Sequence, residues 1–128
     1  MNSTMTILKI MPGRKPEKIT IPHTLDAMQR LVCGNIQAIY PYEDLVAIVC
    51  NEEGKLTGEE PCRVLRDLDT GEIMDIICGT FFICGLTTDD FASLTAKQIQ
   101  HYTKLFEYPE MFLWNGSQLV VLKMDSCA

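Results

Sequence analysis

The fold of this chain is decided by two apolar runs, LVAIVC at residues 45–50 and IICGTFFICGL at residues 76–86. The second run is apolar on both faces over Thr80–Gly85, which is typical of a strand at the centre of a sheet. Between the two runs lies a polar, turn-rich insert. Buried strands that frame a polar connection are where a small domain usually carries its working surface. The insert holds no recognisable catalytic constellation, so we expect a protein that is not an enzyme.

The pattern of apolar residues and turn signals predicts one α+β domain over residues 1–128, with a mixed or mostly antiparallel sheet. The expected strands are Thr6–Met11, Glu17–Ile21, Asn35–Tyr40, Leu45–Cys50, Ile73–Ile77, Thr80–Gly85, Met111–Trp114 and Ser117–Met124. A first helix begins after Thr24, which can cap it, and Gly34 is expected to supply its left-handed stop. A second helix begins at the capping box Thr95-Ala96-Lys97-Gln98 and is over by Pro109. The order is β-β-α-β-β, insert, β-β, α, β-hairpin, with two main helices.

The basic residues of the insert make it a candidate site for an anion. Pro61 is expected to open a short helical segment through Arg66, because proline is tolerated in the first turn of a helix. Arg63 and Arg66 would then share a face. Together with Asn51 and Lys55, they could bind a phosphate or a carboxylate. The alternative is that both arginines pair with nearby carboxylates and hold the connection in place.

Five residues are candidates for contact with a partner, namely Tyr40, Tyr42, Glu52, Glu53 and Trp114. The tyrosines could stack on a base, or pack over a sheet edge as an aromatic turn. The adjacent glutamates Glu52 and Glu53 could form a catalytic pair. We expect instead that both carboxylates are solvated in a turn, because neighbouring side chains point in different directions. Trp114 is the best candidate for a hot spot of a protein interface. Its alternative is a tryptophan that clasps the hairpin to the core.

Charge is distributed unevenly along the chain, which carries a net −6. Residues 40–90 hold twelve acidic and three basic residues, a net −9. This argues against direct binding of a nucleic-acid backbone and fits a basic partner protein, although an ordinary solvated acidic surface is the alternative. No apolar run approaches the length of a membrane span, and the first residues do not resemble a secretory signal. We therefore expect a cytoplasmic protein that does not insert into membranes.

The six cysteines suggest neither a disulfide framework nor a metal site. The nearest pair, Cys78 and Cys84, is six residues apart, and the chain has only two histidines. Structural zinc sites normally use closer pairs. Four of the cysteines lie in or at the end of apolar runs, where a thiol behaves as a small hydrophobe. We expect buried, reduced thiols, with no metal and no cofactor.

Several stretches together carry a family resemblance: LDAMQRLV (25–32) leading to GNIQA (34–38), NEEGKL (51–56) with Pro61 and Arg63, DIICGTFFI (75–83) and DFASL (90–94). Over Thr6–Phe112 the chain resembles a small family carried by phages and conjugative elements of gut Firmicutes, catalogued as a domain of unknown function. Residues 113–128 look like an addition, a C-terminal hairpin. Cys62 stands where the family pattern leads us to expect asparagine. The resemblance implies an accessory protein of a mobile element, active against host defence, and it supplies no catalytic residues.

Two hypotheses about function follow. The first is a non-catalytic inhibitor or binding module that contacts a host protein, itself basic or nucleic-acid-binding, through the acidic middle and the C-terminal hairpin. The second is a protein that binds or sequesters a nucleotide-like anion in a pocket under the insert Asn51–Arg66. Exposed strand edges, above all Ser117–Met124, also make a homodimer a reasonable expectation.

Overall fold

The computed structural model of the chain describes residues 3–124. The described residues form two helices and ten strands, an α+β fold as the sequence predicts. In chain order the elements are β1 (Thr4–Ile10), β2 (Glu17–Pro22), α1 (Leu25–Val32), β3 (Ile36–Ile39), β4 (Val46–Asn51), β5 (Pro61–Arg66), β6 (Ile73–Cys78), β7 (Phe81–Leu86), β8 (Phe91–Ala92), α2 (Ala96–Leu105), β9 (Glu110–Asn115) and β10 (Gln118–Lys123).

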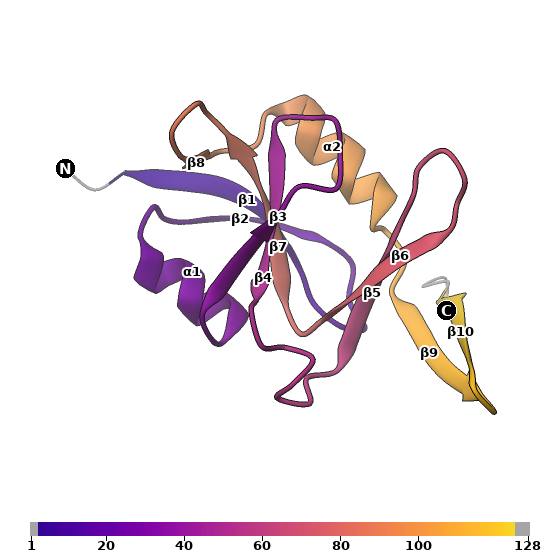
Figure 1. Cartoon of the computed structure of the whole chain (residues 1–128). Helices are drawn as coiled ribbons and strands as arrows, with labels where there is room; N and C mark the ends of the chain where they lie inside the picture. The colour runs from indigo at the N-terminus through magenta and orange to yellow at the C-terminus, as the bar shows by residue number, and fades with distance from the viewer. Residues whose placement is uncertain (1–2, 125–128) are drawn as a thin grey trace.

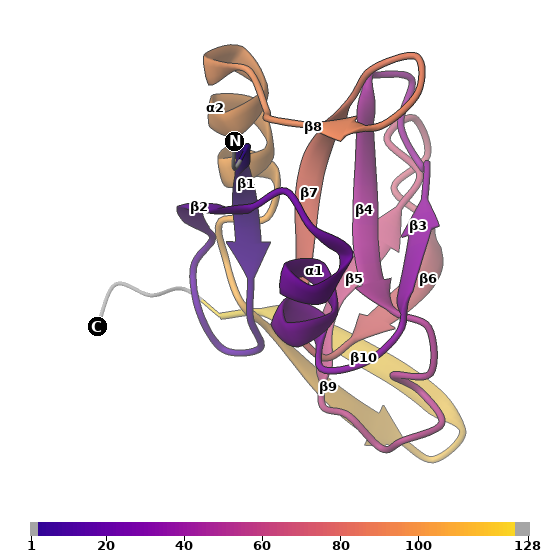
Figure 2. The ribbon, with the colours of Figure 1, turned by 90° about the vertical axis from the view of Figure 1, so that its left-hand side faces the viewer.

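The two apolar runs become β4 and β7, which lie next to each other in the main sheet. The strand order is β2-β1-β7-β4-β3, with the short β8 paired to β7, and every pairing is antiparallel. Figure 2 shows the five long strands side by side in this order. All six residues of β4 are buried, because this strand has a neighbour on each edge and cover on each face. The sequence did not predict β8, which is only two residues long.

Each face of the main sheet has its own core and its own cover. Ala47, Val49 and Phe82 pack on the side of α1. Val46 and Ile48 point the other way, toward α2 and the β5–β6 hairpin, as the alternation of side chains along a strand requires. In Figure 1 the two helices accordingly lie on opposite sides of the sheet. Burial of one large apolar side chain such as Phe82 contributes about 1.5–3 kcal/mol to folding.

Two hairpins complete the fold, and they differ in how they are covered. The β5–β6 hairpin packs on the sheet through Cys62, Leu65 and Ile77, which belong to the α2-side core. The β9–β10 hairpin extends beyond the end of the sheet (Figures 1 and 2). Its turn uses Gly116 and Ser117, one residue later than the Asn-Gly turn signal indicates, and Gly116 has a φ of 65°.

The expected helix over Pro61–Arg66 is wrong, because this segment is strand β5. Pairing with β6 and burial against the sheet override the local helix signal. Pro61 occupies the first position of the strand, where a missing N–H is tolerated. Register shifts on both sides of the segment, between Pro61 and Arg63 and between Leu65 and Arg66, mark bulges. The first shift leaves Cys62 as the extra residue on β5, and the second leaves Met74 as the extra residue on β6.

The C-terminus of α1 also differs from the prediction. Cys33, not Gly34, takes the left-handed conformation, with a φ of 62°, and its N–H donates to the carbonyl of Gln29. Gly34 is needed for a different reason, since a Cβ there would lie 2.7 Å from Nδ2 of Asn51. The start of the helix is as expected, because the side chain of Thr24 accepts a hydrogen bond from the N–H of Ala27.

Within residues 3–124, no helix is both long enough and apolar enough to cross a bilayer.

Candidate functional site

The four anion-binding candidates of the insert do not line one pocket. Asn51 and Lys55 line a hollow of about 380 Å³ between β4 and β6. Arg63 and Arg66 line a separate and smaller hollow of about 70 Å³, near the C-terminus of α2. A single pocket under the whole insert is therefore not what the structure shows, and the two pairs have to be considered separately.

Asn51 is committed to a backbone junction. Its Nδ2 donates to the carbonyls of Val32 and Cys33, at 3.3 and 3.2 Å, and its Oδ1 accepts from the N–H of Glu53 at 2.8 Å. These bonds tie the end of α1 to the first turn of the insert. The side chain is buried and its hydrogen-bonding groups are in use, so its role is structural.

Lys55 forms an ion pair with Asp75 on β6. Burial alone would raise the pKa of the Asp75 carboxyl, but hydrogen bonds from Lys55 and from the N–H of Ile76, with the charge of Lys55, hold this pKa below its ordinary value. Both side chains are more than half exposed. The pair therefore links the insert to β6 at the surface, and it contributes little to stability.

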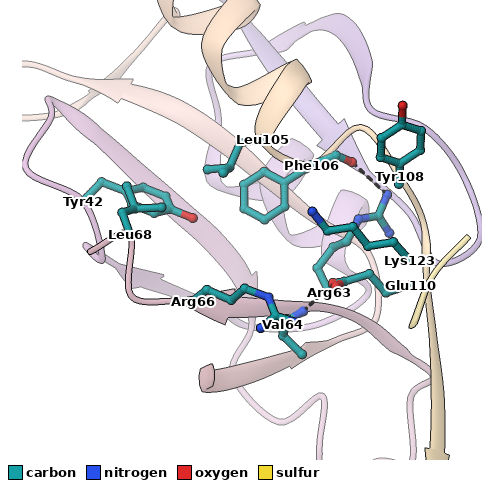
Figure 3. Close-up of a pocket in the computed structure, with 10 residues that line it drawn as sticks. All are labelled: Tyr42, Arg63, Val64, Arg66, Leu68, Leu105, Phe106, Tyr108, Glu110 and Lys123. Carbon is teal, nitrogen blue, oxygen red and sulfur yellow. Dashed lines mark hydrogen bonds between the residues drawn. The ribbon is translucent and has the colours of Figure 1, made fainter. Parts of the chain in front are cut away.

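Arg63 is almost completely buried, at 1% exposure. Figure 3 shows it among the residues that line the hollow. Its Nη1 donates to the carbonyl of Cys62 at 3.0 Å, and its Nη2 donates to the carbonyls of Arg14 and Phe106, at 2.6 and 3.2 Å. Its Nε has no hydrogen-bond partner among the described residues. Burial lowers the pKa of this guanidinium, while the neighbouring Cys62 and Glu110 oppose the shift.

The surroundings of Arg63 make the small hollow electrically positive. Arg66 and Lys123 also line it, and Glu110 is the one carboxylate among the residues around it. That carboxylate accepts a hydrogen bond from the N–H of Val64 at 2.8 Å, and Arg66 donates to the carbonyl of Gly71 at 3.0 Å. Figure 3 shows Arg63, Lys123 and Glu110 grouped together, with Arg66 nearer to Tyr42. The remaining lining is largely apolar or aromatic: Tyr42, Val64, Leu68, Leu105, Phe106 and Tyr108.

The partner candidates in the middle of the chain are dispersed. Tyr42 packs against Tyr102, with ring centroids 5.4 Å apart, and burial raises its pKa. Of the two possibilities given for the tyrosines, stacking on a base or packing as an aromatic turn, Tyr42 follows the second. Tyr40 is 62% exposed, and Glu52 and Glu53 are exposed at the first turn of the insert. Neither carboxylate forms an ion pair among the described residues.

The C-terminal hairpin is the most unusual surface of the molecule. Trp114 is 71% exposed, so it does not clasp the hairpin to the core. The cross-strand pairs Trp114–Leu119 and Phe112–Val121 share one face, and Leu113–Val120 and Met111–Leu122 share the other. Met111, Leu113, Trp114 and Leu122 are all more than two-fifths exposed. Both faces of the hairpin are therefore apolar and accessible.

One face of the hairpin continues into a shallow groove against β6. This groove, of about 450 Å³, is lined by Phe112, Trp114 and Leu119 from the hairpin, and by Pro61, Ile73, Met74 and Ile76 from the β5–β6 hairpin. Ile73 and Met74 are themselves 43% and 51% exposed. Sequence reasoning missed these two residues, since an apolar pair at the start of a strand gives no sign of exposure.

The cysteines among the described residues form no disulfide, and their burial differs. Cys50, Cys62 and Cys84 are buried, Cys78 is partly exposed and Cys33 is exposed. Burial raises the pKa of Cys62 and of Cys84 to about 12, which leaves them as unreactive thiols. No three His, Cys, Asp or Glu side chains among residues 3–124 are placed to hold a metal ion. The sixth cysteine, Cys127, lies outside the described residues.

Comparison with known proteins places most of the chain in one family. No curated protein and no solved structure matches the sequence. A domain of unknown function, DUF3846, matches residues 5–107, which covers the sheet, both helices and the insert. The match ends before the exposed β9–β10 hairpin, which begins at Glu110. The chain belongs to the DUF3846 family of domains of unknown function.

Proposed function

We propose that this protein is a non-catalytic binding module that acts by contact with another protein, and that the β9–β10 hairpin is its contact surface. One observation carries the proposal: the hairpin is apolar on both faces and extends beyond the end of the main sheet, so that its side chains are exposed. From Met111 to Leu122 the sequence contains no charged residue, in a chain that is 22% charged. Large exposed apolar patches of this kind mark interaction surfaces in folded proteins.

The energetics of the hairpin support this function. A two-stranded hairpin is at best marginally stable in water on its own, so an apolar hairpin gains from being covered. Trp114 is the natural anchor, because an indole offers roughly 150–250 Å² of contact area and tryptophan is enriched at interface hot spots. The groove between the hairpin and β6 extends the same apolar surface.

The partner that fits this surface is a protein with an apolar patch bordered by basic residues. Glu60 lies beside Trp114 and Phe112 around a hollow at the base of the hairpin, and residues 40–90 carry a net −9. A basic border on the partner would complement these charges and speed association. A second copy of the chain is the other occupant to be tested. No strand among the described residues pairs with the outer edge of β10, and residues 118–122 lack the charges that usually protect such an edge.

The test uses two matched variants, Trp114→Ser on the hairpin and Leu56→Ser on the insert. Leu56 is 87% exposed and does not belong to the hairpin, so its variant controls for loss of an exposed apolar side chain. We expect a partner captured from host extract, then purified, to bind the wild type and Leu56→Ser alike. Trp114→Ser should weaken binding about thirtyfold, which corresponds to a hot spot of about 2 kcal/mol. Equal binding by all three proteins would contradict the proposal, and a concentration-dependent dimer abolished by Trp114→Ser would identify the partner as a second copy.

We propose further that the partner is a host protein and that the chain acts as an accessory protein of a phage or mobile element against host defence. The support is the resemblance of residues 6–112 to a family carried by such elements. Expression of the chain in a defended bacterial host should restore phage plaque formation, and Trp114→Ser should lose this effect. No change in plaque formation with the wild type would argue against this role.

A further inference from the structure

Among the described residues, the hollow beside Arg63 is lined by more cations than carboxylates. Arg63, Arg66 and Lys123 line it together with a single carboxylate, that of Glu110. Among residues 3–124, no carboxylate oxygen lies within 4.0 Å of any of these three cations. Of the three cations Arg63 is buried, Arg66 is half-buried and Lys123 is exposed, and burial of a charge such as that of Arg63 is costly unless the charge is paired. The chain as a whole carries −6, so the positive character of the hollow is local and runs against the overall charge.

The protein groups around Arg63 explain how the guanidinium is held but not how its charge is balanced. Its Nη1 and Nη2 donate to three backbone carbonyls, which fix its position between β5, the Arg14 turn and the end of α2. Neutral carbonyls do not compensate a full positive charge, and the nearby charge of Glu110 opposes the lowering of the Arg63 pKa by burial without cancelling it. Among the described residues, Nε has no hydrogen-bond partner. The Arg63 guanidinium is 1% exposed, is held by three carbonyls and forms no ion pair among the described residues. It is therefore positioned in advance to bind an anion.

We propose that this hollow is a binding site for a compact oxyanion, and that the phosphoryl group of a small molecule is its ligand. Three cations and one carboxylate leave a net charge of +2, which a phosphate dianion neutralises and a single carboxylate does not. The hollow has a volume of about 70 Å³, far less than the hollow of about 380 Å³ beside Asn51 and Lys55. We expect a phosphoryl group to enter this small hollow and any remainder of the molecule to stay outside.

The walls of the hollow strengthen such binding. Val64, Leu105 and Phe106 are apolar, and a low local dielectric increases the attraction between the cations and an anion. Glu110 does not compete fully for the cations, because its Oε1 accepts the N–H of Val64. Among the described residues Lys123 forms no ion pair, and Arg66 donates one N–H to the carbonyl of Gly71, so both retain donors for a ligand.

The site is independent of the hairpin contact, although both involve the end of the chain. Lys123 is the last residue of β10 and pairs with Glu110 at the base of the hairpin, whereas the apolar contact residues lie between Met111 and Leu122. The expected phosphoryl ligand requires Arg66 and Lys123, while the protein contact requires Trp114. Variants at these positions therefore separate the two activities.

The experiment follows the arginine Nε–H signals of the full-length ¹⁵N-labelled protein by NMR while inorganic phosphate is added at constant ionic strength. We expect saturable shifts of the Arg63 and Arg66 signals. Arg66→Gln and Lys123→Gln should each weaken phosphate binding about tenfold, as loss of a charge-assisted hydrogen bond does. Lys18→Gln removes an equal charge at an exposed position of β2, a strand that contributes no residue to the hollow, and should leave binding unchanged. Arg63 itself is kept, because its hydrogen bonds hold three backbone segments together.

Two further titrations define the ligand. A nucleoside 5′-monophosphate that shifts the same signals more tightly than inorganic phosphate would assign the site to an organic phosphate, and the reverse order would assign it to free phosphate. Acetate should produce no saturable shift. The proposal is overturned if phosphate gives only linear shifts, if acetate binds as well as phosphate, or if Lys18→Gln weakens binding as much as Arg66→Gln does.

Discussion

At the scale of single residues, the contact between Gly34 and Asn51 is the sharpest packing constraint of the fold. A Cβ at position 34 would lie 2.7 Å from Nδ2 of Asn51, which is itself bonded to Val32 and Cys33. We expect Gly34→Ala to lower the free energy of unfolding by about 1–3 kcal/mol, as overpacking does. Asn51→Ala should cost about 2 kcal/mol through its unsatisfied backbone partners. Urea unfolding of each variant measures both values.

The double variant gives the decisive comparison for this contact. Asn51→Ala removes the side chain with which a Cβ at position 34 would clash. In that background, Gly34→Ala should therefore lower the free energy of unfolding by at least about 1 kcal/mol less than it does in the wild type. Strictly additive effects would show that the two residues do not interact as the structure places them.

The exposed carboxylate of Asp44 makes the stability of the fold depend on pH in the acid range. Partial burial would raise its pKa, but hydrogen bonds from the Tyr102 hydroxyl at 2.9 Å, from the N–H of Leu45 and from Gln98 hold this pKa below its ordinary value. The folded pKa lies below the unfolded value of about 3.9, so the carboxylate stabilises the fold above that value. The stabilisation is lost as the pH falls through the folded pKa. We expect Asp44→Asn to be less stable than the wild type at pH 7.

Thermal unfolding from pH 7 to pH 2 checks this prediction. The difference in unfolding temperature between wild type and Asp44→Asn should shrink below about pH 5 and vanish at the acid end. Tyr102→Phe should reduce the same pH-dependent difference, because it removes the hydroxyl donor. A difference that stays constant over the whole pH range would contradict the assignment.

At the residue scale, local signals could be predicted from the sequence and distant partners could not. The capping box of Thr95 and Gln98 is confirmed, because both of its hydrogen bonds join residues three positions apart. The partners of Arg63 include carbonyls 49 and 43 residues away, so its burial depends on tertiary structure. The positive hollow could not be predicted for the same reason, since it joins β5 to Lys123 at the far end of the chain.

At the scale of elements, the hairpin β9–β10 should be separable from the rest of the domain. The DUF3846 match ends at residue 107, and the hairpin extends beyond the sheet. A chain that ends after Glu110 keeps the hydrogen bond from Val64 to that carboxylate. We expect this truncated chain to unfold cooperatively, with a midpoint within a few degrees of the wild type, and to lose partner binding. Circular dichroism melting curves provide the measurement, and a chain without a folded baseline would show that the hairpin is part of the core.

The elements were predicted with two exceptions, β5 and the two-residue strand β8. Strands and helices with a strong apolar period or a clear cap were found, including both apolar runs and the C-terminal hairpin. β5 was taken for a helix because Pro61 and the arginine spacing are local signals, whereas its pairing with β6 is not. Burial beneath the main sheet decided the outcome, which is the usual way in which tertiary context overrides local propensity.

At the scale of the whole molecule, the acidic middle and the apolar hairpin should affect different steps of partner binding. We expect Glu59→Gln together with Glu60→Gln to slow association with the partner a few-fold and to weaken its dependence on salt, because rim charges act on encounter. Trp114→Ser should instead speed dissociation, since a buried anchor sets the lifetime of a complex. Biolayer interferometry at low and high salt separates the two rates. A pure change in dissociation for the glutamate variants would contradict a steering role.

The central claim is that the hairpin forms the contact with a partner, and site-specific photocrosslinking in host cells tests it most directly. A photoreactive phenylalanine analogue replaces Trp114 in one protein and Leu56 in another, because both side chains are exposed but only Trp114 belongs to the hairpin. We predict a discrete adduct from position 114, to one protein or to a second copy of this chain, and none from position 56. The absence of an adduct at position 114, or the same adducts at both positions, would contradict the account.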